Sequence, residues 1–409
     1  MEIRPIVSAL LRNKTGALLI AAQIALTLAI VSNAAYIIRD RVAISSRPSG
    51  IDDESRVFHI AVDSINTPGD PLALQKQEER LLAALPGVES VSATNQTPLS
   101  QSGWNMGLFL DKAQTDSSAN IAFYFTPGPL VRTLGLKLVE GRDLTDADVE
   151  VINVRENEHR LGHVAVISQA LAKKLFPGDA SAVGKHVFLG NSADAPEYEI
   201  VGVVERLQSP WAQHGEAGEL SLITAIRPIQ AYVDYVVRTE PGQIDRVMRE
   251  VEAALTRAGN ERLLIDKQTM PETRNQRYRA DNAMVWMLLT ITVLLLLVTA
   301  SGIVGMATLW VNQRRKQIGV RRALGARRAD ILRYFITENV LISSLGIAAG
   351  TVLALALNQL LVSQFELSRL PLPHLLVGMG VLWILGIVAV YGPARRAASV
   401  APATATRSA

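Results

Sequence analysis

The chain has 409 residues, of which 49% are hydrophobic and none is cysteine, and this excludes disulfides, thiolate nucleophiles and cysteine-ligated metals. The net charge of +3 hides an asymmetry: residues 40–280 carry 25 Lys/Arg against 33 Asp/Glu, a balance of −8, and the remainder carries 16 against 5, a balance of +11. An acidic middle segment between basic, apolar flanks fits a chain divided by a membrane and argues against a nucleic-acid partner.

The first residues predict two membrane elements. Residues 1–14 form a short amphipathic helix with Arg4 and Arg12, suited to the inner surface of a membrane. Residues 15–38 are an apolar segment that is long for a signal peptide, and no small-x-small cleavage site follows it. We therefore predict an uncleaved first transmembrane helix whose N-terminus is cytoplasmic.

Residues 41–280 have the character of a soluble domain. Strand-like alternation over 57–65 is followed by helical spacing over 71–88, and a strand–helix–strand pattern recurs near the end, in AYVDYVVRTE, IDRVMREVEAALTRAG and RLLIDKQTM. We expect these two units to be halves of one α/β subdomain, brought together when the chain returns. Between them lies a Gly-rich, strand-rich insertion, about 104–221.

Three patterns in this domain resemble ligand sites but do not meet their rules. Gly178-x5-Gly184-Lys185 is one residue too long for a phosphate loop and lacks the Ser/Thr, so we expect a turn at Gly184. His159 and His163 lack the adjacent Glu of a zinc protease motif, and we expect exposed loop histidines. A third pattern, Asp143, Asp146 and Asp148, is out of register for a calcium loop, so we expect a turn or helix start.

A second apolar span covers residues 284–310, bracketed by Trp286 and Trp310, which we expect to be interfacial anchors. The polar stretch before it, ETRNQRYRADNAM, is compatible with a helix. One interpretation is a helix that runs from the soluble domain into the membrane without a break and would act as a stalk. An ordinary helix with a frayed end is the alternative.

Residues 312–333 form a basic loop with eight Lys/Arg and a single acid, Asp330. Such a loop between two spans faces the cytoplasm. Apolar residues interleave with Arg321 and Arg322, so a short helix here would be amphipathic, Gly325 would end it, and Asp330 would begin the next helix. From charge alone, the loop could serve only to set topology.

Two further spans complete the predicted membrane domain. The third covers 339–362 and contains Gly346 and Gly350, whose spacing lets helices pack closely. The fourth covers 372–391 and is followed by a cytoplasmic tail, 392–409. The fold class is therefore an α+β membrane protein with four transmembrane helices and one large domain between the first and second.

The basic loop and the first part of the third span, RRKQIGVRRALGARRADILRYFITENVLISSLGIAAG, resemble the signature of the FtsX/MacB family of ABC-transporter permeases. Gln317 stands where that family usually has Glu. The resemblance implies that this segment docks into the nucleotide-binding subunit. It assigns ATPase coupling to Gln317, Ile318, Gly319, Arg321, Arg322, Leu324, Gly325 and Ala326. We expect Ile318 and Leu324 to supply the apolar contact, and Arg321 and Arg322 to pair with carboxylates of the partner.

Two other stretches carry the same resemblance. LGLKLVEGRDLTDAD, VAVISQALAKKLFPGDASAVGKHVFLG and YEIVGVVERL resemble the periplasmic core of MacB-type permeases, which implies a porter-like subdomain plus a β-rich one. YGPARRAAS resembles the end of the family's last helix, although the acidic positions that usually follow are lost. The sequence contains no Walker A phosphate loop, so we expect no enzymatic activity and no directly bound cofactor, with ATP and Mg²⁺ used by a separate ATPase subunit.

The resemblance implies a bacterial inner-membrane permease that works by mechanotransmission. The partners it implies are an ABC ATPase, a second permease chain (identical or a sister), a periplasmic adaptor, a TolC-like outer-membrane channel and membrane lipids. The cargo would be a drug, peptide, siderophore or lipid. Two alternatives stay open: a LolC/LolE-like lipoprotein-releasing permease, and an FtsX-like signalling subunit that activates a cell-wall hydrolase. The long insertion disfavours the second alternative.

Overall fold

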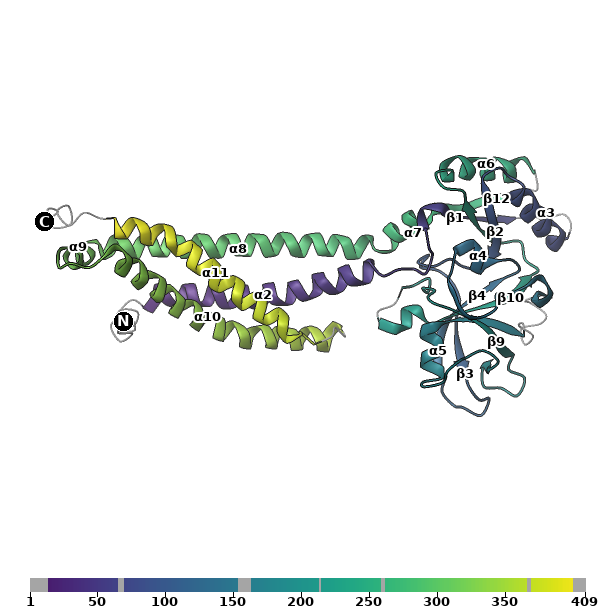
Figure 1. Cartoon of the computed structure of the whole chain (residues 1–409), viewed down its shortest axis with the longest axis horizontal. Coiled ribbons are helices and arrows are strands. Elements are labelled where there is room, and N and C mark those ends of the chain that lie inside the picture. Colours follow the sequence, from purple (N-terminus) through teal and green to yellow (C-terminus); the bar gives the residue numbers. More distant parts are fainter. Residues whose placement is uncertain are drawn as a thin grey trace. The chain divides into compact units, whose positions relative to one another are not determined.

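Within the described residues, the helices long and apolar enough to cross a membrane number four: α2 (Lys14–Ser45), α8 (Arg279–Gln313), α10 (Arg328–Phe365) and α11 (Leu372–Ala398). The computed structural model (Figure 1) describes residues 14–64, 70–153, 163–212, 215–258, 262–365 and 369–399. The chain divides into a helical unit, residues 1–45 and 280–409, and a β-rich unit, residues 46–279. The predicted amphipathic helix before Lys14 and the tail after Ser399 lie outside the described residues.

In the helical unit, α10 packs along α2 through small residues. A Cβ on Gly346 would lie 2.7 Å from the carbonyl oxygen of Ala21, and a Cβ on Gly350 would lie 2.9 Å from the Cα of Ala25. The two backbones therefore approach more closely than any larger residue would allow. Half of the apolar window of α2 is buried inside the unit, against 11% of that of α8, so α2 is the central helix.

Polar side chains in these helices bond to neighbouring helices. The Asn33 amide on α2 donates to the carbonyl oxygen of Ala354 on α10 at 3.1 Å, and the hydroxyls of Thr27 and Thr299 are 2.8 Å apart. A Cβ on Gly302 would lie 2.6 Å from the Gln23 side-chain oxygen, so that amide fills the space a larger residue would need. These groups are used in packing the helices together.

The observed helices extend beyond the predicted spans. Helix α10 begins at Arg328 and not near 339, because the amphipathic segment continues into the apolar one without a break. Helix α11 runs past residue 391 to Ala398, with Pro393 inside it.

The structure rejects one of the two interpretations of the segment before α8, and it corrects the expectation for Trp310. The helix is not continuous with the preceding segment: α7 (Met270–Arg277) ends at Tyr278, whose dihedral angles leave the helical region, before α8 begins. Tyr278 is buried, with the Arg277 guanidinium 5.3 Å from its ring centre, and this packing holds the interruption. Trp310 is only 5% exposed and belongs to the core of the helical unit, so it does not act as an interfacial anchor.

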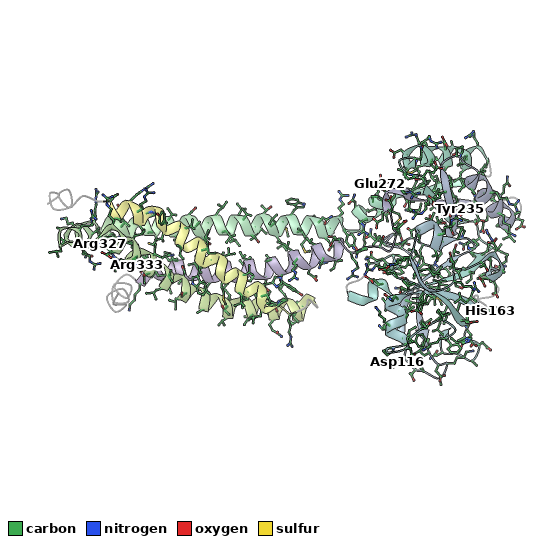
Figure 2. All side chains as sticks on the ribbon, viewed as in Figure 1. Asp116, His163, Tyr235, Glu272, Arg327 and Arg333 are labelled. Carbon is green, nitrogen blue, oxygen red and sulfur yellow. The ribbon has the colours of Figure 1, made fainter. Side chains whose placement is uncertain are left out.

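The β-rich unit contains a four-stranded sheet built from both ends of the domain. Its order is β12-β1-β11-β2, so the early strands pair with the late ones as the chain's return predicted. Helices α3 and α6 lie beside this sheet (Figure 1), and Tyr235 of β11 is labelled in Figure 2. Leu82 of α3 and Val247 of α6 belong to the same buried apolar cluster as Tyr235. The bounds are β1 Val57–Ser64, α3 Pro71–Ala83, β2 Val88–Thr94, β11 Val233–Thr239, α6 Ile244–Arg257 and β12 Arg262–Thr269.

The insertion forms an eight-stranded sheet that closes on itself. Its strands follow the order β4-β3-β8-β9-β7-β10-β6, with β5 paired to β9, and a further parallel pairing of β10 with β4 completes a ring of six strands. The insertion ends at Pro228, later than the predicted 221, because β10 belongs to this ring. The bounds are β3 Asn105–Phe109, β4 Ala119–Thr126, α4 Leu130–Leu134, β5 Leu138–Gly141, β6 Glu150–Ile152, β7 Val164–Ser168, α5 Gln169–Leu175, β8 His186–Leu189, β9 Glu197–Val204 and β10 Ser221–Pro228.

Candidate functional site

The basic loop folds into a helical hairpin. Helix α9 (Arg315–Ala323) follows α8 after a change of direction at Arg314, whose φ of −98° and ψ of 11° leave the α-helical region. Backbone hydrogen bonds continue on both sides of this residue, from Arg314 N to the carbonyl of Trp310 and from Ile318 N to the carbonyl of Arg314, each 3.0 Å. Figure 1 shows α9 at the end of the helical unit where α10 begins.

The turn between α9 and α10 is set by the two residues that the sequence singled out for it. Gly325 has a φ of +95°, which closes α9, and the backbone N of Ala326 donates to the carbonyl of Arg321 at 3.1 Å. The Asp330 carboxylate accepts a hydrogen bond from the backbone N of Arg327 at 2.9 Å, at the start of α10. Gly325 as helix stop and Asp330 as helix start are both confirmed.

One face of α9 packs inside the chain. Ile318 is 5% exposed and joins Ile331 and Phe335 of α10 in the core of the helical unit, and Gly319 is also buried. A crevice of about 20 Å³ lies between the two helices, lined by Arg314, Gln317, Ile318, Arg321, Ile331, Tyr334 and Phe335. Ile318 therefore holds α9 to its own chain.

The opposite face is basic and exposed. Leu324 is 83% exposed and Val320, one turn earlier, is 50% exposed, while Arg315 and Lys316 are exposed on the same helix. Arg327 and Arg333 lie at the same end of the helical unit (Figure 2). The expected apolar pair Ile318–Leu324 is thus split, and the exposed pair is Val320 and Leu324. Two exposed apolar side chains on a helix that also carries exposed basic side chains can bind an apolar groove with acidic edges.

Sequence reasoning missed the polar contact that anchors this hairpin. The carboxylate of Glu338, on α10, places both oxygens 2.9 Å from Nη1 of Arg314, and Glu338 is buried. The guanidinium of Arg321 lies 5.1 Å from the ring centre of Tyr334. A glutamate inside an apolar helical segment is the signal that could have found the pair, because such a residue needs a partner.

Two other candidate patterns form a turn and a helix start in the described residues. Lys185 is paired with Asp179, and Gly184 has a φ of +80°, which confirms the expected turn. Asp148 receives two hydrogen bonds from Arg142, which hold the pKa of its carboxyl well below its ordinary value, and it also closes a capping box with Thr145. The aspartate cluster is thus a helix start, as expected.

The histidine pair is only partly visible. His159 lies outside the described residues, and His163 is exposed, with its Nε2 2.8 Å from a Glu150 carboxylate oxygen. Across the described residues, no group of three or more His, Cys, Asp or Glu could hold a metal ion.

Comparison with known families finds two matching family models, one for each part of the chain. Residues 20–254 match the MacB-like periplasmic core domain, and residues 289–402, which include α9, match the FtsX-like permease C-terminal domain. The chain belongs to the MacB-like permease family. Its match to the core domain covers more than half of the sequence, and its second unit carries the match to the FtsX-like permease domain.

Individual relatives agree with this assignment. The pyoverdine export ATP-binding/permease protein PvdT of Pseudomonas syringae pv. tomato is 28% identical over 81% of this chain and 48% of its own length. The macrolide export ATP-binding/permease protein MacB of Marinobacter nauticus is 29% identical over 62% of this chain and 39% of its own length. This MacB-like permease therefore spans less than half the length of either relative. A solved permease-protein domain from Porphyromonas gingivalis matches with 18% identity over 53% of this chain and 91% of that domain, at a TM-score of 0.30.

Proposed function

We propose that this protein is the permease part of an ABC exporter, and that α9 is the element that receives the motion of the ATPase. The observation that carries the proposal is the two-sided character of α9: one face is fixed to α10, while the other exposes Val320 and Leu324 among basic side chains. A short helix held firmly on one side and free on the other can transmit a push from a docked partner to the helices behind it.

We propose mechanotransmission as the mode of work. The polar side chains of the membrane helices, such as Asn33 and Thr27, are used in contacts between helices, and this supports a bundle that moves as a packed body over one that lines an aqueous path. ATP-driven closure of the ATPase would displace α9 and tilt α10 and its neighbours. This motion would in turn change the conformation of the β-rich unit. In this account both termini are cytoplasmic and the β-rich unit is periplasmic, in the bacterial inner membrane.

The proposed cargo follows from the names of the two relatives given above, and the proposed partners follow from the family. Both are named as export proteins, one for pyoverdine and one for macrolides, and this supports small-molecule export. The proposed assembly contains an ABC ATPase, a second permease chain, a periplasmic adaptor and a TolC-like channel. The MacB-like core favours export over lipoprotein release or hydrolase activation.

The experiment is reconstitution of the full chain in liposomes with its cognate ABC ATPase. We expect no ATP turnover by the permease chain itself and a several-fold rise in the turnover of the ATPase when the two are together. An ATPase whose rate is unchanged by the permease, or ATP turnover by the permease chain above that of a contaminant control, would overturn the proposal.

A further inference from the structure

The Arg314–Glu338 contact is a largely buried ion pair within the helical unit. Both carboxylate oxygens of Glu338 lie 2.9 Å from the same Arg314 nitrogen, the Glu338 side chain is 1% exposed and that of Arg314 is 17% exposed. The Tyr334 hydroxyl is 3.4 Å from that nitrogen. Charged groups in such a place are costly to bury, and an apolar pair of similar size can give equal or greater stability. An apolar pair does not, however, fix the relative orientation of the two helices as a hydrogen-bonded ion pair does.

The pair is one of three side-chain contacts between the α9 segment and the start of α10. Arg314, Ile318 and Arg321 succeed each other at spacings of four and three, so they share one face of α9. Glu338, Tyr334 and Ile331, read backwards along α10, have the same spacings and share one of its faces. Arg314 meets Glu338, Ile318 packs with Ile331 and Phe335, and Arg321 covers Tyr334.

Arg314 is also the residue at which the chain turns from α8 into α9. A change of helix direction is a natural place for a hinge. Here the hinge residue carries the side chain that is fixed to α10. A force applied to the exposed face of α9 is therefore passed to α10, and bending is directed to the junction with α8.

We propose that Arg314 and Glu338 are positioning residues, and that their ion pair makes α9 and the start of α10 move as one rigid body. This proposal rests on the proposed function of α9 as the element that docks on an ATPase. It identifies which membrane helix is driven, namely α10, and which contact drives it.

The test uses the absence of cysteine from the natural chain, which makes site-specific spin labelling direct. One label is placed at Lys316 or Ala323 on α9 and a second at Ser363 near the far end of α10, all exposed positions. At ~1.5 Å per residue along a helix, these pairs are roughly 40–50 Å apart, within range of pulsed electron spin resonance. The full chain is measured in lipid nanodiscs.

We expect a narrow distance distribution for the wild type and a broad one for Glu338→Gln and for Arg314→Gln. Since a single change leaves a buried charge unpaired and can simply unfold the end of the bundle, Arg314→Leu/Glu338→Leu is the deciding variant. It should recover the wild-type melting temperature and keep the broad distribution. Asp281→Asn, which removes an ion pair to Arg41 far along the sequence from α9, is the matched control and should keep the narrow one. A narrow distribution in the double-Leu variant would overturn the proposal.

A second measurement separates this proposal from the one it rests on. With the cognate ATPase, the double-Leu variant should bind as tightly as the wild type while cargo transported per ATP falls at least tenfold. Leu324→Asp leaves the ion pair intact and tests docking alone. Normal transport by the double-Leu variant, combined with lost binding by Leu324→Asp, would reject the positioning role and keep the docking role. Wild-type binding and transport by Leu324→Asp would instead reject the docking role.

Discussion

His59 Nδ1 lies 3.2 Å from an Asp234 carboxylate oxygen, across the neighbouring strands β1 and β11, and each residue is 5% exposed. Asp266 of β12 approaches the other ring nitrogen at 4.0 Å. Burial lowers the pKa of His59, but the charge and hydrogen bond of Asp234, together with the charge of Asp266, outweigh it, so the pKa is raised. The β-rich unit thus contains a histidine whose charged form is stabilised by folding.

This pair predicts a pH dependence of stability. Because the folded-state pKa is above the unfolded value of about 6.5, the stabilisation is full below that pH and is lost as the pH rises through the folded pKa. Each unit of upward shift is worth about 1.4 kcal/mol. We expect the free energy of unfolding of the wild type, relative to His59→Gln, to fall between pH 6 and pH 9. Urea unfolding at pH 6 and at pH 9 measures this difference in free energy between the wild type and the variant. An equal difference at the two pH values would contradict the prediction.

The close α2–α10 contact predicts that a methyl group added to a glycine is destabilising inside the contact and not destabilising outside it. Gly346→Ala places a Cβ 2.7 Å from the carbonyl oxygen of Ala21 and should destabilise the helical unit by about 1–3 kcal/mol. Gly380→Ala in α11 is the matched control, because no atom lies within 4 Å of its Cβ position. That change should be neutral or stabilising by up to about 1 kcal/mol, through helix propensity. Unfolding in mixed detergent measures both, and equal effects of the two changes would reject the close packing.

A buried ion pair fixes α3 to the four-stranded sheet. Arg262 donates to both carboxylate oxygens of Glu78 at 2.6–2.7 Å, and the Tyr235 hydroxyl donates to the same carboxylate at 2.6 Å. Glu78→Ala removes the carboxylate that neutralises the buried guanidinium and should cost about 3–5 kcal/mol in urea unfolding. The exposed pair Arg246–Glu250 is the control, and Glu250→Ala should cost about 0.5 kcal/mol or less. A loss below about 1 kcal/mol for Glu78→Ala would show that the cluster is not rigidly paired.

The proposed topology predicts the behaviour of reporter fusions. A reporter enzyme active only in the periplasm should work when fused near Asn191, in the β-rich unit, and fail when fused near Arg322, in α9. The reason is the basic hairpin, which is retained on the cytoplasmic side. Activity at both positions, or the reverse pattern, would contradict the four-span arrangement.

Local signals in the sequence predicted local structure well. The backbone freedom of glycine at 325 and the capping carboxylate of Asp330 act within one helical turn, so their roles could be read directly. The partner of Glu338 could not, because Arg314 is 24 residues away and meets it only after the hairpin turns back. The same holds for the pairing of β10 with β4, which closes the ring of strands across about a hundred residues.

The division of the α9 surface shows a subtler limit. Ile318 and Leu324 are six residues apart, so they are about 120° apart around a helix and do not share a face. Helical periodicity indicates that apolar residues occupy two sides. It does not say which side packs on the same chain, since that depends on where Ile331 and Phe335 lie.

The most direct test of the docking role of α9 is ATP-driven transport and ATPase binding by Leu324→Asp. Because Leu324 is 83% exposed, the change should leave the free energy of unfolding within about 0.5 kcal/mol of the wild-type value. Leu263→Asp, at an exposed position in the β-rich unit, is the matched control and should behave as wild type. We predict that Leu324→Asp inserts normally and loses at least tenfold in affinity for the ATPase, with transport reduced in parallel. Wild-type affinity and transport in this variant would contradict the assignment of α9 as the docking element.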